Sequence, residues 1–454
     1  MKIGANYILK GALLLGFATF TAKLLGAIYR IPLTNMIGGY GLGLYQMIFP
    51  VYAVLLDLSG AGLPTAMSKT ISSYKGLDRE QFAYTCLRKA RRAFFIVGLF
   101  FVSILAICSK IFAGLQGNSN AYLGYLFLAP AILPVCMLSC YRGYFQGLLV
   151  MQPTALTQII EQVFKLIFGL LFVQAFLPNI PLAVGGATLG ITLSEVVALI
   201  SIYIMYKTRR KKLNLNLRNN FSDNAKLFSA IIKVIIPVTI TSILLPLSQV
   251  LDSFILINKI SAYSKDATSL YGLLSGVALT IIGLPVALCY GIATVTIPSV
   301  SAVDNNKKDS LSVKSMFITM LFSLGFAILC YCFSKTIISI LFSRLTLAEK
   351  NISTALLKIL SGGIVLLSML QTQNAILIAY GKNFVPSITL FFGVMCKIFI
   401  NIFMASQPKF NIYAGAIGII ACYFVPCLIN LIILFSIRVR NVYKTNSAWQ
   451  FANR

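Results

Sequence analysis

The sequence predicts an all-α polytopic membrane protein with about twelve transmembrane helices in two six-helix lobes. Three observations predict this fold: the apolar composition, the series of long apolar segments and an internal repeat. Of the 454 residues, 58% are hydrophobic and 11% are charged, and the mean hydropathy is +0.87. Because one membrane-spanning helix needs about 20 mostly apolar residues, twelve helices need roughly 240 positions, which this composition supplies. The same composition excludes a soluble globular domain.

The apolar segments are bounded by Gly, Pro or clusters of charge, and each is long enough to cross a bilayer. We expect the twelve spans near residues 9–33, 42–74, 93–113, 120–147, 155–177, 183–206, 227–258, 270–301, 313–334, 352–380, 384–406 and 411–437.

The net charge of +27 comes from 38 basic and 11 acidic residues, and its distribution along the chain is uneven. The two tails and the even-numbered connections contain 24 of the Lys and Arg residues, counting Lys10, Arg142 and Lys314 in the adjoining parts of spans, whereas the odd-numbered connections contain 7. By the positive-inside rule, both termini lie in the cytoplasm. The excess charge is therefore a signal of membrane topology and of attraction to an anionic inner leaflet, and nucleic acid is not an expected partner.

Several kinds of chemistry are not expected from this composition. The chain has no histidine, which removes the usual general base and the commonest metal ligand. Its ten cysteines form no C-x-x-C pair and lie in apolar runs. A membrane-embedded prenyl or glycosyl transferase would need clustered acidic residues for metal-bound diphosphate, and no D-D-x-x-D or similar cluster is present. We therefore expect no metal site, no cofactor and no enzyme activity.

The long basic stretch 207–226 follows the sixth span and predicts a cytoplasmic linker between an N-terminal lobe, 1–206, and a C-terminal lobe, 227–454. The two lobes resemble each other in sequence. The pairs that align at separations of 232 to 234 residues are Gly147 with Gly381, Pro153 with Pro386, Lys165 with Lys397 and Pro64 with Pro298. Because each lobe has an even number of spans, both enter the membrane in the same direction, as in parallel-repeat transporters.

Basic residues inside the spans are candidates for binding an anionic ligand, because a charge within a bilayer usually faces a cavity or a partner. Lys23 and Arg30 lie seven residues apart, which places them within about 20° on one helix face and roughly 10 Å apart. Arg30 could instead reach the outer interface. Lys397 has Gly393, not an acid, four residues before it, and Lys69 completes the set of candidate cavity cations.

Acidic residues inside the spans allow two interpretations. Glu161 and Lys165 have the spacing and order of an internal ion pair on a helix. Asp57, Glu195 and Asp252 are candidates for binding a coupling Na⁺ or H⁺, and each could equally neutralise a nearby Lys or Arg.

Two spans contain residues that interrupt helices. The second span has Gly60, Gly62 and Pro64, and the eighth has Pro285, Gly291 and Pro298. Such residues free backbone groups and permit bending, so these positions are candidate gating breaks, with a static kink as the alternative.

Three segments carry a resemblance to a known family: KLLGAIYRIPL (23–33), CYRGYFQGLLVMQPTALTQIIEQ (140–162) and LDSFILI (251–257). They resemble the polysaccharide-flippase branch of the multidrug/oligosaccharidyl-lipid/polysaccharide (MOP) exporter superfamily, nearest to its stage V sporulation protein B-like and lipid II flippase-like members. The resemblance implies a MATE-like (MOP) fold of two lobes that alternate between inward-open and outward-open states. Lys23 and Arg30 match basic positions of the family, whereas Asp57 stands where the branch tends to have arginine.

The resemblance also implies the function. We expect a flippase that moves an undecaprenyl-diphosphate-linked oligosaccharide or peptidoglycan precursor across the bacterial cytoplasmic membrane, serving the machinery of cell-wall, spore-cortex or surface-polysaccharide synthesis. The cations would hold the diphosphate, and polar residues within the spans would contact the sugars, namely Gln46, Gln158, Gln162, Gln371 and Asn374. The alternative is a MATE-type exporter of drugs or organic cations coupled to H⁺ or Na⁺.

Overall fold

All the secondary structure of the described residues is helical. A computed structural model of the whole chain describes residues 5–60, 62–74, 79–212, 224–301 and 305–452. Contacts between Cα atoms divide the chain into two compact units, Met1–Ile257 and Asn258–Arg454, which are described separately below.

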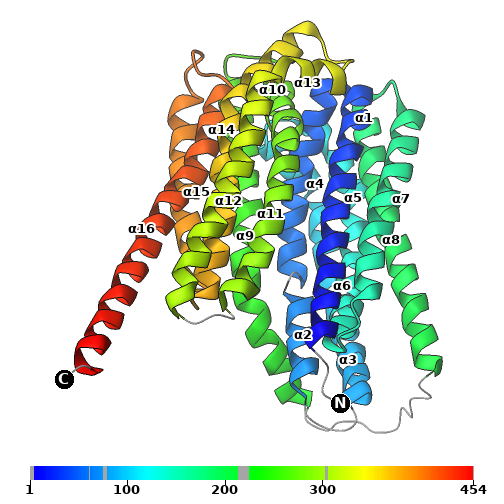
Figure 1. Cartoon of the computed structure of the whole chain (residues 1–454). Coiled ribbons are helices and arrows are strands. Elements are labelled where there is room, and N and C mark those ends of the chain that lie inside the picture. Colours follow the sequence, from blue (N-terminus) through cyan, green and yellow to red (C-terminus); the bar gives the residue numbers. More distant parts are fainter. Residues whose placement is uncertain (1–4, 61, 75–78, 213–223, 302–304, 453–454) are drawn as a thin grey trace. The chain divides into compact units, whose positions relative to one another are not determined.

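The first unit contains the N-terminal helices (Figure 1). They are α1 Ala5–Gly60, α2 Leu63–Ser73, α3 Arg79–Ile107, α4 Ser109–Leu115, η1 Ser119–Ala121, α5 Tyr122–Leu128, η2 Ala129–Ala131, α6 Ile132–Gly147, α7 Gln152–Phe176, α8 Ile180–Lys212 and most of α9 Asn224–Ser261. The second unit contains α10 Ala267–Gly272, the π-helix η3 Leu273–Ala278, α11 Leu279–Ser301, α12 Asn305–Cys332, α13 Ser334–Leu341, α14 Leu347–Ala379, α15 Val385–Met404 and α16 Tyr413–Ala452.

Eleven helical segments within the described ranges are long and apolar enough to cross a membrane. The first, Leu14–Ser73, has 60 residues, and a straight helix of that length would measure about 90 Å, three times the hydrocarbon core. It is instead broken at Gly38, whose φ of 67° and ψ of −174° are not helical. Figure 1 shows the two halves of α1 running in opposite directions. This segment therefore accounts for two of the twelve expected spans, and the predicted all-α membrane fold is confirmed.

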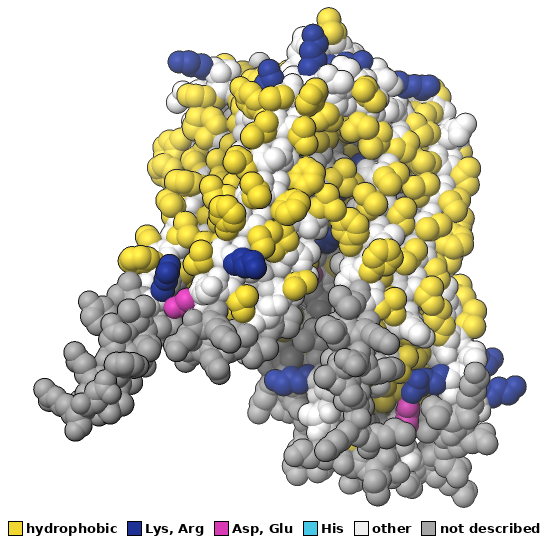
Figure 2. Space-filling view, viewed as in Figure 1, with side chains coloured by type: hydrophobic (Ala, Val, Ile, Leu, Met, Phe, Trp, Pro, Cys, Tyr) yellow, Lys and Arg dark blue, Asp and Glu magenta, His cyan; other side chains and the backbone are white. Residues whose placement is uncertain are grey.

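The surface agrees with a membrane environment. Figure 2 shows hydrophobic side chains over most of the visible face, with Lys and Arg near the ends of the helices. Phe17, Phe100, Phe317 and Phe435, which come from four different spans, are each at least 60% exposed. Large apolar side chains so far out of the core indicate contact with lipid rather than with water.

Local sequence signals explain where several helices begin. Pro occupies the first turn of α2, α7 and α15, where its missing N–H is not needed. Thr346 and Glu349 form a capping box at the start of α14, each side chain accepting a hydrogen bond from the other residue's backbone N–H. The Asn179 side chain accepts a hydrogen bond from the backbone N–H of Leu182 at 3.1 Å, which caps the first turn of α8.

The turns after α6 and α14 have the same backbone pattern, one in each unit. Leu149 has φ of 62° and Gly381 has φ of 77°, each one residue beyond the helix cap. In both turns the following N–H bonds back five residues, from Val150 to Phe145 and from Lys382 to Leu377, each at 2.9 Å. These are Schellman motifs, and they lie 232 residues apart, as the predicted repeat requires. The structural counterpart of Gly381 is thus Leu149, not Gly147.

The helix breaks in spans two and eight differ. In span two, α1 ends at Gly60 and α2 begins at Leu63, with Pro64 in its first turn. In span eight, α11 continues through Pro285, Gly291 and Pro298 as far as Ser301. The irregular part of that span is the π-helix η3, which precedes all three residues, so bending at Pro285, Gly291 and Pro298 stays a prediction. A π-helix arises when hydrogen bonds shift to i→i+5, which needs neither Pro nor Gly.

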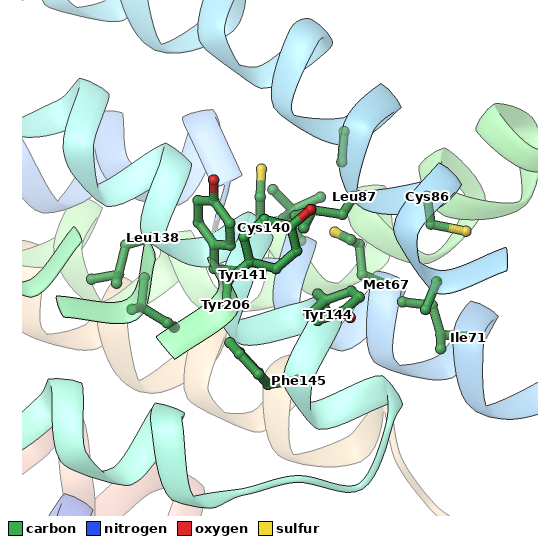
Figure 3. Packing of buried hydrophobic residues seen from close by; sticks show 14 of the residues in the cluster. Met67, Ile71, Cys86, Leu87, Leu138, Cys140, Tyr141, Tyr144, Phe145 and Tyr206 are labelled. Carbon is green, nitrogen blue, oxygen red and sulfur yellow. The ribbon is translucent and has the colours of Figure 1, made fainter. Parts of the chain in front are cut away.

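A buried cluster holds one end of the first unit together (Figure 3). It joins α2, α3, α6 and α8 through Met67, Leu87, Tyr141, Tyr144 and Tyr206, among others. The rings of Tyr141 and Tyr206 are 5.3 Å apart, and those of Tyr144 and Tyr206 are 5.6 Å apart. Because Tyr141 and Tyr144 face this cluster, the side chain of Arg142, which follows Tyr141 on α6, points in another direction.

Candidate functional site

The first unit contains a cluster of charged and polar side chains on α6, α7 and α8, within the membrane-spanning part. We call it the carboxyl cluster, and it consists of Arg142, Thr157, Glu161, Gln162, Lys165 and Glu195.

Glu161 is the centre of the carboxyl cluster. Its Oε2 lies 3.1 Å from Nη2 of Arg142, and its Oε1 accepts a hydrogen bond from Nε2 of Gln162 at 2.9 Å. Nε of Arg142 also donates to Oγ1 of Thr157 at 3.4 Å. The Arg142 and Glu161 side chains are 16% and 19% exposed, so the pair is largely shielded from solvent. Both carboxylate oxygens of Glu161 are therefore engaged by donors within this unit.

Glu195 brings a second carboxyl group from α8. It is 7% exposed and interacts electrostatically with Glu161, Arg142 and Lys165. Its Oε2 and the hydroxyl of Tyr52 on α1 are both buried without a hydrogen-bond partner. Tyr52 is 2% exposed and interacts electrostatically with both carboxyl groups. The site therefore places two carboxyl groups and an unpartnered hydroxyl near one another, away from solvent.

The predicted ion pair between Glu161 and Lys165 is wrong in its partner, because Glu161 pairs with Arg142. Nζ of Lys165 instead lies 5.5 Å from the ring centroid of Tyr29 and 5.3 Å from that of Phe49. The planar guanidinium can donate to Glu161 and Thr157 at once, which an ammonium cannot do in the same geometry. Lys165 keeps a favourable environment through the negative faces of the two rings.

Close packing fixes the helices that carry these side chains. A Cβ at Gly190 of α8 would lie 2.5 Å from Cα of Gly169 on α7, so the two backbones touch at this point. A Cβ at Gly143 of α6 would lie 2.8 Å from Cβ of Met67 and 3.1 Å from Cα of Pro64 on α2. Glycine is required at these contacts because any side chain would push the helices apart.

The predicted cations in the first unit lie on α1 and α2. Lys23 is exposed and Arg30 is half-buried, and the unbroken helix between them places both on one flank of α1. Arg30 interacts electrostatically with Tyr29 and Tyr45. Tyr29 thus interacts with both Arg30 and Lys165. Lys69 is exposed on α2.

The predicted polar residues of the first unit lie at different depths. Gln162 belongs to the carboxyl cluster, and Gln158, one turn earlier on α7, accepts a hydrogen bond from Thr19 of α1 at 3.2 Å. Gln46 is buried on α1 with 6% exposure. Gln46 belongs to α1, whereas Gln158 and Gln162 belong to α7. The candidate polar contacts of the first unit therefore lie on α1 and α7.

The two other predicted ion-coupling carboxyls are separate from the carboxyl cluster. Asp57 on α1 is half-buried and hydrogen-bonds Ser242 of α9. Asp252 on α9 is 8% exposed. Of the three predicted candidates, Glu195 is the one for which the structure gives an electrostatic interaction with a second carboxyl group, that of Glu161.

The predicted residues of the second unit lie on α14 and α15. Lys397 is 5% exposed, and a Cβ at Gly418 of α16 would lie 3.1 Å from its Cγ, so its stem packs on α16. Oδ1 of Asn374 accepts a hydrogen bond from Nδ2 of Asn430 at 2.9 Å. Gln371 is half-buried, and its Oε1 has no hydrogen-bond partner. At the end of α14, outside the span, burial and then a hydrogen bond to Asp309 raise the pKa of Tyr380 to about 12.

Arg142 and the tyrosines of α1 are the residues that sequence reasoning missed. Arg142 counts as part of a connection in the sequence, yet it lies inside the predicted span 120–147 and inside α6. Its position within an apolar segment was the signal that could have identified it. Tyr29 and Tyr52 gave no such signal, because the chain has 21 tyrosines and only packing separates these two.

Comparison with known proteins identifies the family. A family model described as polysaccharide biosynthesis protein matches residues 8–304, well over half of the chain. The chain belongs to this polysaccharide biosynthesis protein family. The MatE model also matches residues 237–403.

Curated relatives of this family member include two from Bacillus subtilis (strain 168). Stage V sporulation protein B is 26% identical over 306 residues, which are 66% of this chain and 59% of that protein. The chain thus aligns with less than two thirds of that relative's length. Lipid II flippase MurJ is 24% identical over 442 residues, which are 92% of this chain and 81% of that protein.

Solved structures show the same fold as this family member. An inward-facing multidrug resistance MATE family transporter of the MOP superfamily has a TM-score of 0.78 at 14% identity, over 97% of this chain and 99% of the other. Lipid II flippase MurJ in an inward closed conformation has a TM-score of 0.73 at 17% identity, over 95% and 89%. This polysaccharide biosynthesis protein is therefore a multi-pass membrane protein with the fold of these transporters, which is the fold that the resemblance in the sequence implied.

Proposed function

We propose that this protein is a flippase that moves an undecaprenyl-diphosphate-linked oligosaccharide or peptidoglycan precursor from the inner to the outer leaflet of the bacterial cytoplasmic membrane. The observation that carries the proposal is the alignment of 92% of the chain with a lipid II flippase, within a family described by polysaccharide biosynthesis. Such a flippase works by alternating access and breaks no covalent bond.

The cations of both units support an anionic headgroup as the ligand. Lys23 and Arg30 share one flank of α1, and Lys397 is buried in the second unit. A diphosphate offers several anionic oxygens, which a guanidinium binds in a bidentate manner and a lysine binds as a point charge. Lys69 would add attraction near the end of span two. In this proposal, sugar hydroxyls hydrogen-bond to the amides of Gln46, Gln158, Gln162, Gln371 and Asn374.

The proposal includes the arrangement in the membrane. Both termini and the basic stretch 207–226 lie in the cytoplasm, and the lobes 1–206 and 227–454 rock about that linker. Gly60, Gly62 and Pro64 permit bending in span two. Asp57, Glu195 and Asp252 are the candidates for the coupling ion, H⁺ or Na⁺, and a cell-wall or polysaccharide synthesis machinery supplies and consumes the lipid.

A second candidate is a MATE-type exporter of organic cations. The MatE model matches residues 237–403, and a MATE transporter has the same fold at a TM-score of 0.78. Such an exporter would bind its substrate through carboxylates and aromatic rings, and would not need Lys23 or Arg30.

Depletion of the protein in its host cell tests the proposal. Depleted cells are expected to accumulate one undecaprenyl-diphosphate-linked intermediate on the inner leaflet, measured by extraction and by protection from an external impermeant reagent. Wild type and the charge-retaining pair Lys23→Arg and Arg30→Lys should restore export. The pair Lys23→Glu and Arg30→Glu should reduce it by more than about tenfold, because each charge-assisted hydrogen bond contributes roughly 1.5–3 kcal/mol.

Two results would contradict the flippase. One is that no lipid-linked intermediate accumulates on depletion. The other is that the charge-reversed variant restores full export, while wild-type cells expel a cationic dye that depleted cells retain. The second result would support the exporter.

A further inference from the structure

We propose that the first unit binds the headgroup of an anionic phospholipid where α3, α6 and α8 meet. The binding surface, which we call the headgroup patch, consists of Tyr84 and Arg91 on α3, Tyr141 on α6, and Tyr203 and Arg210 on α8. The proposal goes beyond the flippase and does not depend on it, because it requires only that the chain spans a membrane.

The start of α3 and the end of α8 are strongly basic. Residues 79–92 contain five Lys or Arg and one acid, Glu80, and residues 203–211 contain four Lys or Arg and no acid. Figure 1 shows these two helix ends at the same end of the first unit. Nη2 of Arg209 lies 2.6 Å from Oε1 of Glu80, so the one acid of the two segments is already paired. The two segments therefore keep an excess of positive charge.

Aromatic rings hold the two arginines of the headgroup patch. Cζ of Arg91 lies 5.5 Å from the centroid of the Tyr141 ring, and Cζ of Arg210 lies 5.3 Å from that of Tyr84. A ring attracts the face of a guanidinium and leaves the N–H groups at its edge able to donate. Within the described ranges, neither arginine forms an ion pair with a carboxylate. A phosphate can therefore accept two parallel hydrogen bonds from such a group.

Helical spacing places both guanidinium groups on one side of α3. Tyr84 and Arg91 are seven residues apart, so they share a face of this helix, about 10 Å apart along its axis. Arg210 of α8 lies over Tyr84 and is therefore on the same face. The ring of Tyr203 is 6.2 Å from that of Tyr141, which carries Arg91. The five side chains thus form one continuous surface across three helices.

The headgroup patch lies where the exposed surface changes from apolar to basic. Beyond Arg91 on α3, Ile96 and Phe100 are 69% and 60% exposed, and Ile204 on α8 is 57% exposed. Large apolar side chains this exposed are in contact with lipid chains. Tyr203 is 44% exposed, and tyrosine is typical of the boundary between membrane and water. A ligand with apolar chains beside an anionic phosphate fits this surface, whereas a free anion would leave its apolar part unused.

The headgroup patch is separate from the cations proposed for the flippase substrate. Those cations lie on α1, α2 and α15, whereas the patch belongs to α3, α6 and α8. We therefore assign the patch to a phospholipid of the surrounding bilayer. A lipid held here bridges α3 and α8, and it should stabilise the first unit in proportion to its occupancy.

Native mass spectrometry of the detergent-purified full-length protein tests the binding. The probe is dioleoyl phosphatidylglycerol, and dioleoyl phosphatidylcholine is the neutral comparison. Wild type should bind the anionic lipid more tightly. The double variant Arg91→Gln and Arg210→Gln should raise its Kd by roughly 25-fold, because each basic residue near an anionic headgroup contributes about fivefold. Arg91→Lys with Arg210→Lys keeps the charge and should lose less.

Lys110→Gln is the matched control. Lys110 is exposed and its Nζ lies 5.8 Å from the ring centroid of Tyr122, beyond the other end of α3. It is therefore also a cation over a tyrosine ring, but outside the headgroup patch. This variant should bind phosphatidylglycerol as wild type does. Equal losses in the control and in the double glutamine variant would show a general effect of charge and would overturn the assignment.

Thermal unfolding shows whether the double variant is folded. Without lipid, the double glutamine variant should unfold near the temperature of wild type. Added phosphatidylglycerol should raise the unfolding temperature of wild type and leave that of the variant unchanged. An equal rise in both proteins would contradict binding at the headgroup patch.

Photocrosslinking of wild type needs no substitution, so it decides the matter even if a variant fails to fold. Phosphatidylglycerol with a photoreactive headgroup should label residues 84–100 and 200–211. Labelling confined to other segments overturns the proposal, as does displacement of the lipid by inorganic phosphate at the same concentration. Tighter binding of undecaprenyl diphosphate than of phosphatidylglycerol at these residues would also overturn it and would assign the patch to the proposed substrate.

Discussion

The choice of partner by Glu161 shows how one residue type decides the electrostatics of a membrane site. Arg142 and Lys165 both belong to the carboxyl cluster, yet it is Arg142 that lies 3.1 Å from the Glu161 carboxylate. Its guanidinium binds Glu161 and Thr157 together, so the acid on α7 is held to α6. The lysine lies over the rings of Tyr29 and Phe49 instead. The arginine can bind two acceptors through its planar fork, whereas the lysine acts as a point charge.

Arg142→Ala should destabilise the protein by about 3 kcal/mol, because removing one partner of a shielded pair leaves an uncompensated charge on Glu161. The measurement is thermal or denaturant unfolding in one detergent. Arg142→Lys keeps the charge and should recover part of the loss. Equal stability of the alanine variant and wild type would show that Glu161 does not depend on this pair.

At the scale of secondary-structure elements, glycines allow α7 and α8 to pack closely together. Gly186 and Gly190 are spaced as in the small-xxx-small pattern of membrane helices, and a Cβ at either would lie within 2.7 Å of α7. Lipid and apolar side chains are equally apolar, so close backbone approach is a main source of helix association in a membrane. The electrostatic interaction of Glu161 on α7 with Glu195 on α8 depends on that approach.

Gly190→Ala should destabilise the protein by about 1–3 kcal/mol, because the added methyl group would overlap the α7 backbone. Gly362→Ala on α14 is the matched control, since a Cβ there meets no atom within 4 Å. Unfolding measurements on both variants decide the matter: the control should be neutral or slightly stabilising, as Gly→Ala in a helix usually is. Equal effects at the two sites would argue against the close crossing.

The linker expected from the sequence and the packing of the helices divide the whole molecule at different points. The sequence divides it at the basic stretch 207–226, whereas contacts assign α9 as far as Ile257 to the first unit. The reason lies in three contacts along α9. A Cβ at Gly62 would lie 3.0 Å from the Ile235 backbone, Asp57 hydrogen-bonds Ser242, and Nε2 of Gln116 donates to Oγ of Ser253 at 2.7 Å. Span seven is thus held to the first unit at three points along its length.

The charge distribution predicts the orientation of the whole chain. A green fluorescent reporter fused after Arg454 should be fluorescent, because the C-terminus is expected in the cytoplasm, where this reporter folds. Alkaline phosphatase inserted after Gly117, between spans three and four, should be active, because that connection is expected outside. The reversed pattern of activity would contradict the topology, and with it the direction of the proposed transport.

The sequence by itself determined the membrane class, the positions of nearly all the helices and the family. Each of these depends on local or additive properties: apolar length, Pro and Gly at helix ends, and the sign of charge in connections. It also identified Glu161, Lys165, Gln162 and Glu195 one by one, since a polar residue in an apolar span is conspicuous.

Only the tertiary structure decided which of these residues act together. The Arg142–Glu161 pair and the electrostatic interactions of Glu195 and Tyr52 with Glu161 each join different helices, so no spacing along the chain encodes them. The same holds for the π-helix in span eight and for the packing of α9. Contacts between helices depend on how closely the backbones approach, and that distance is set by glycines and ring packing on both partners at once.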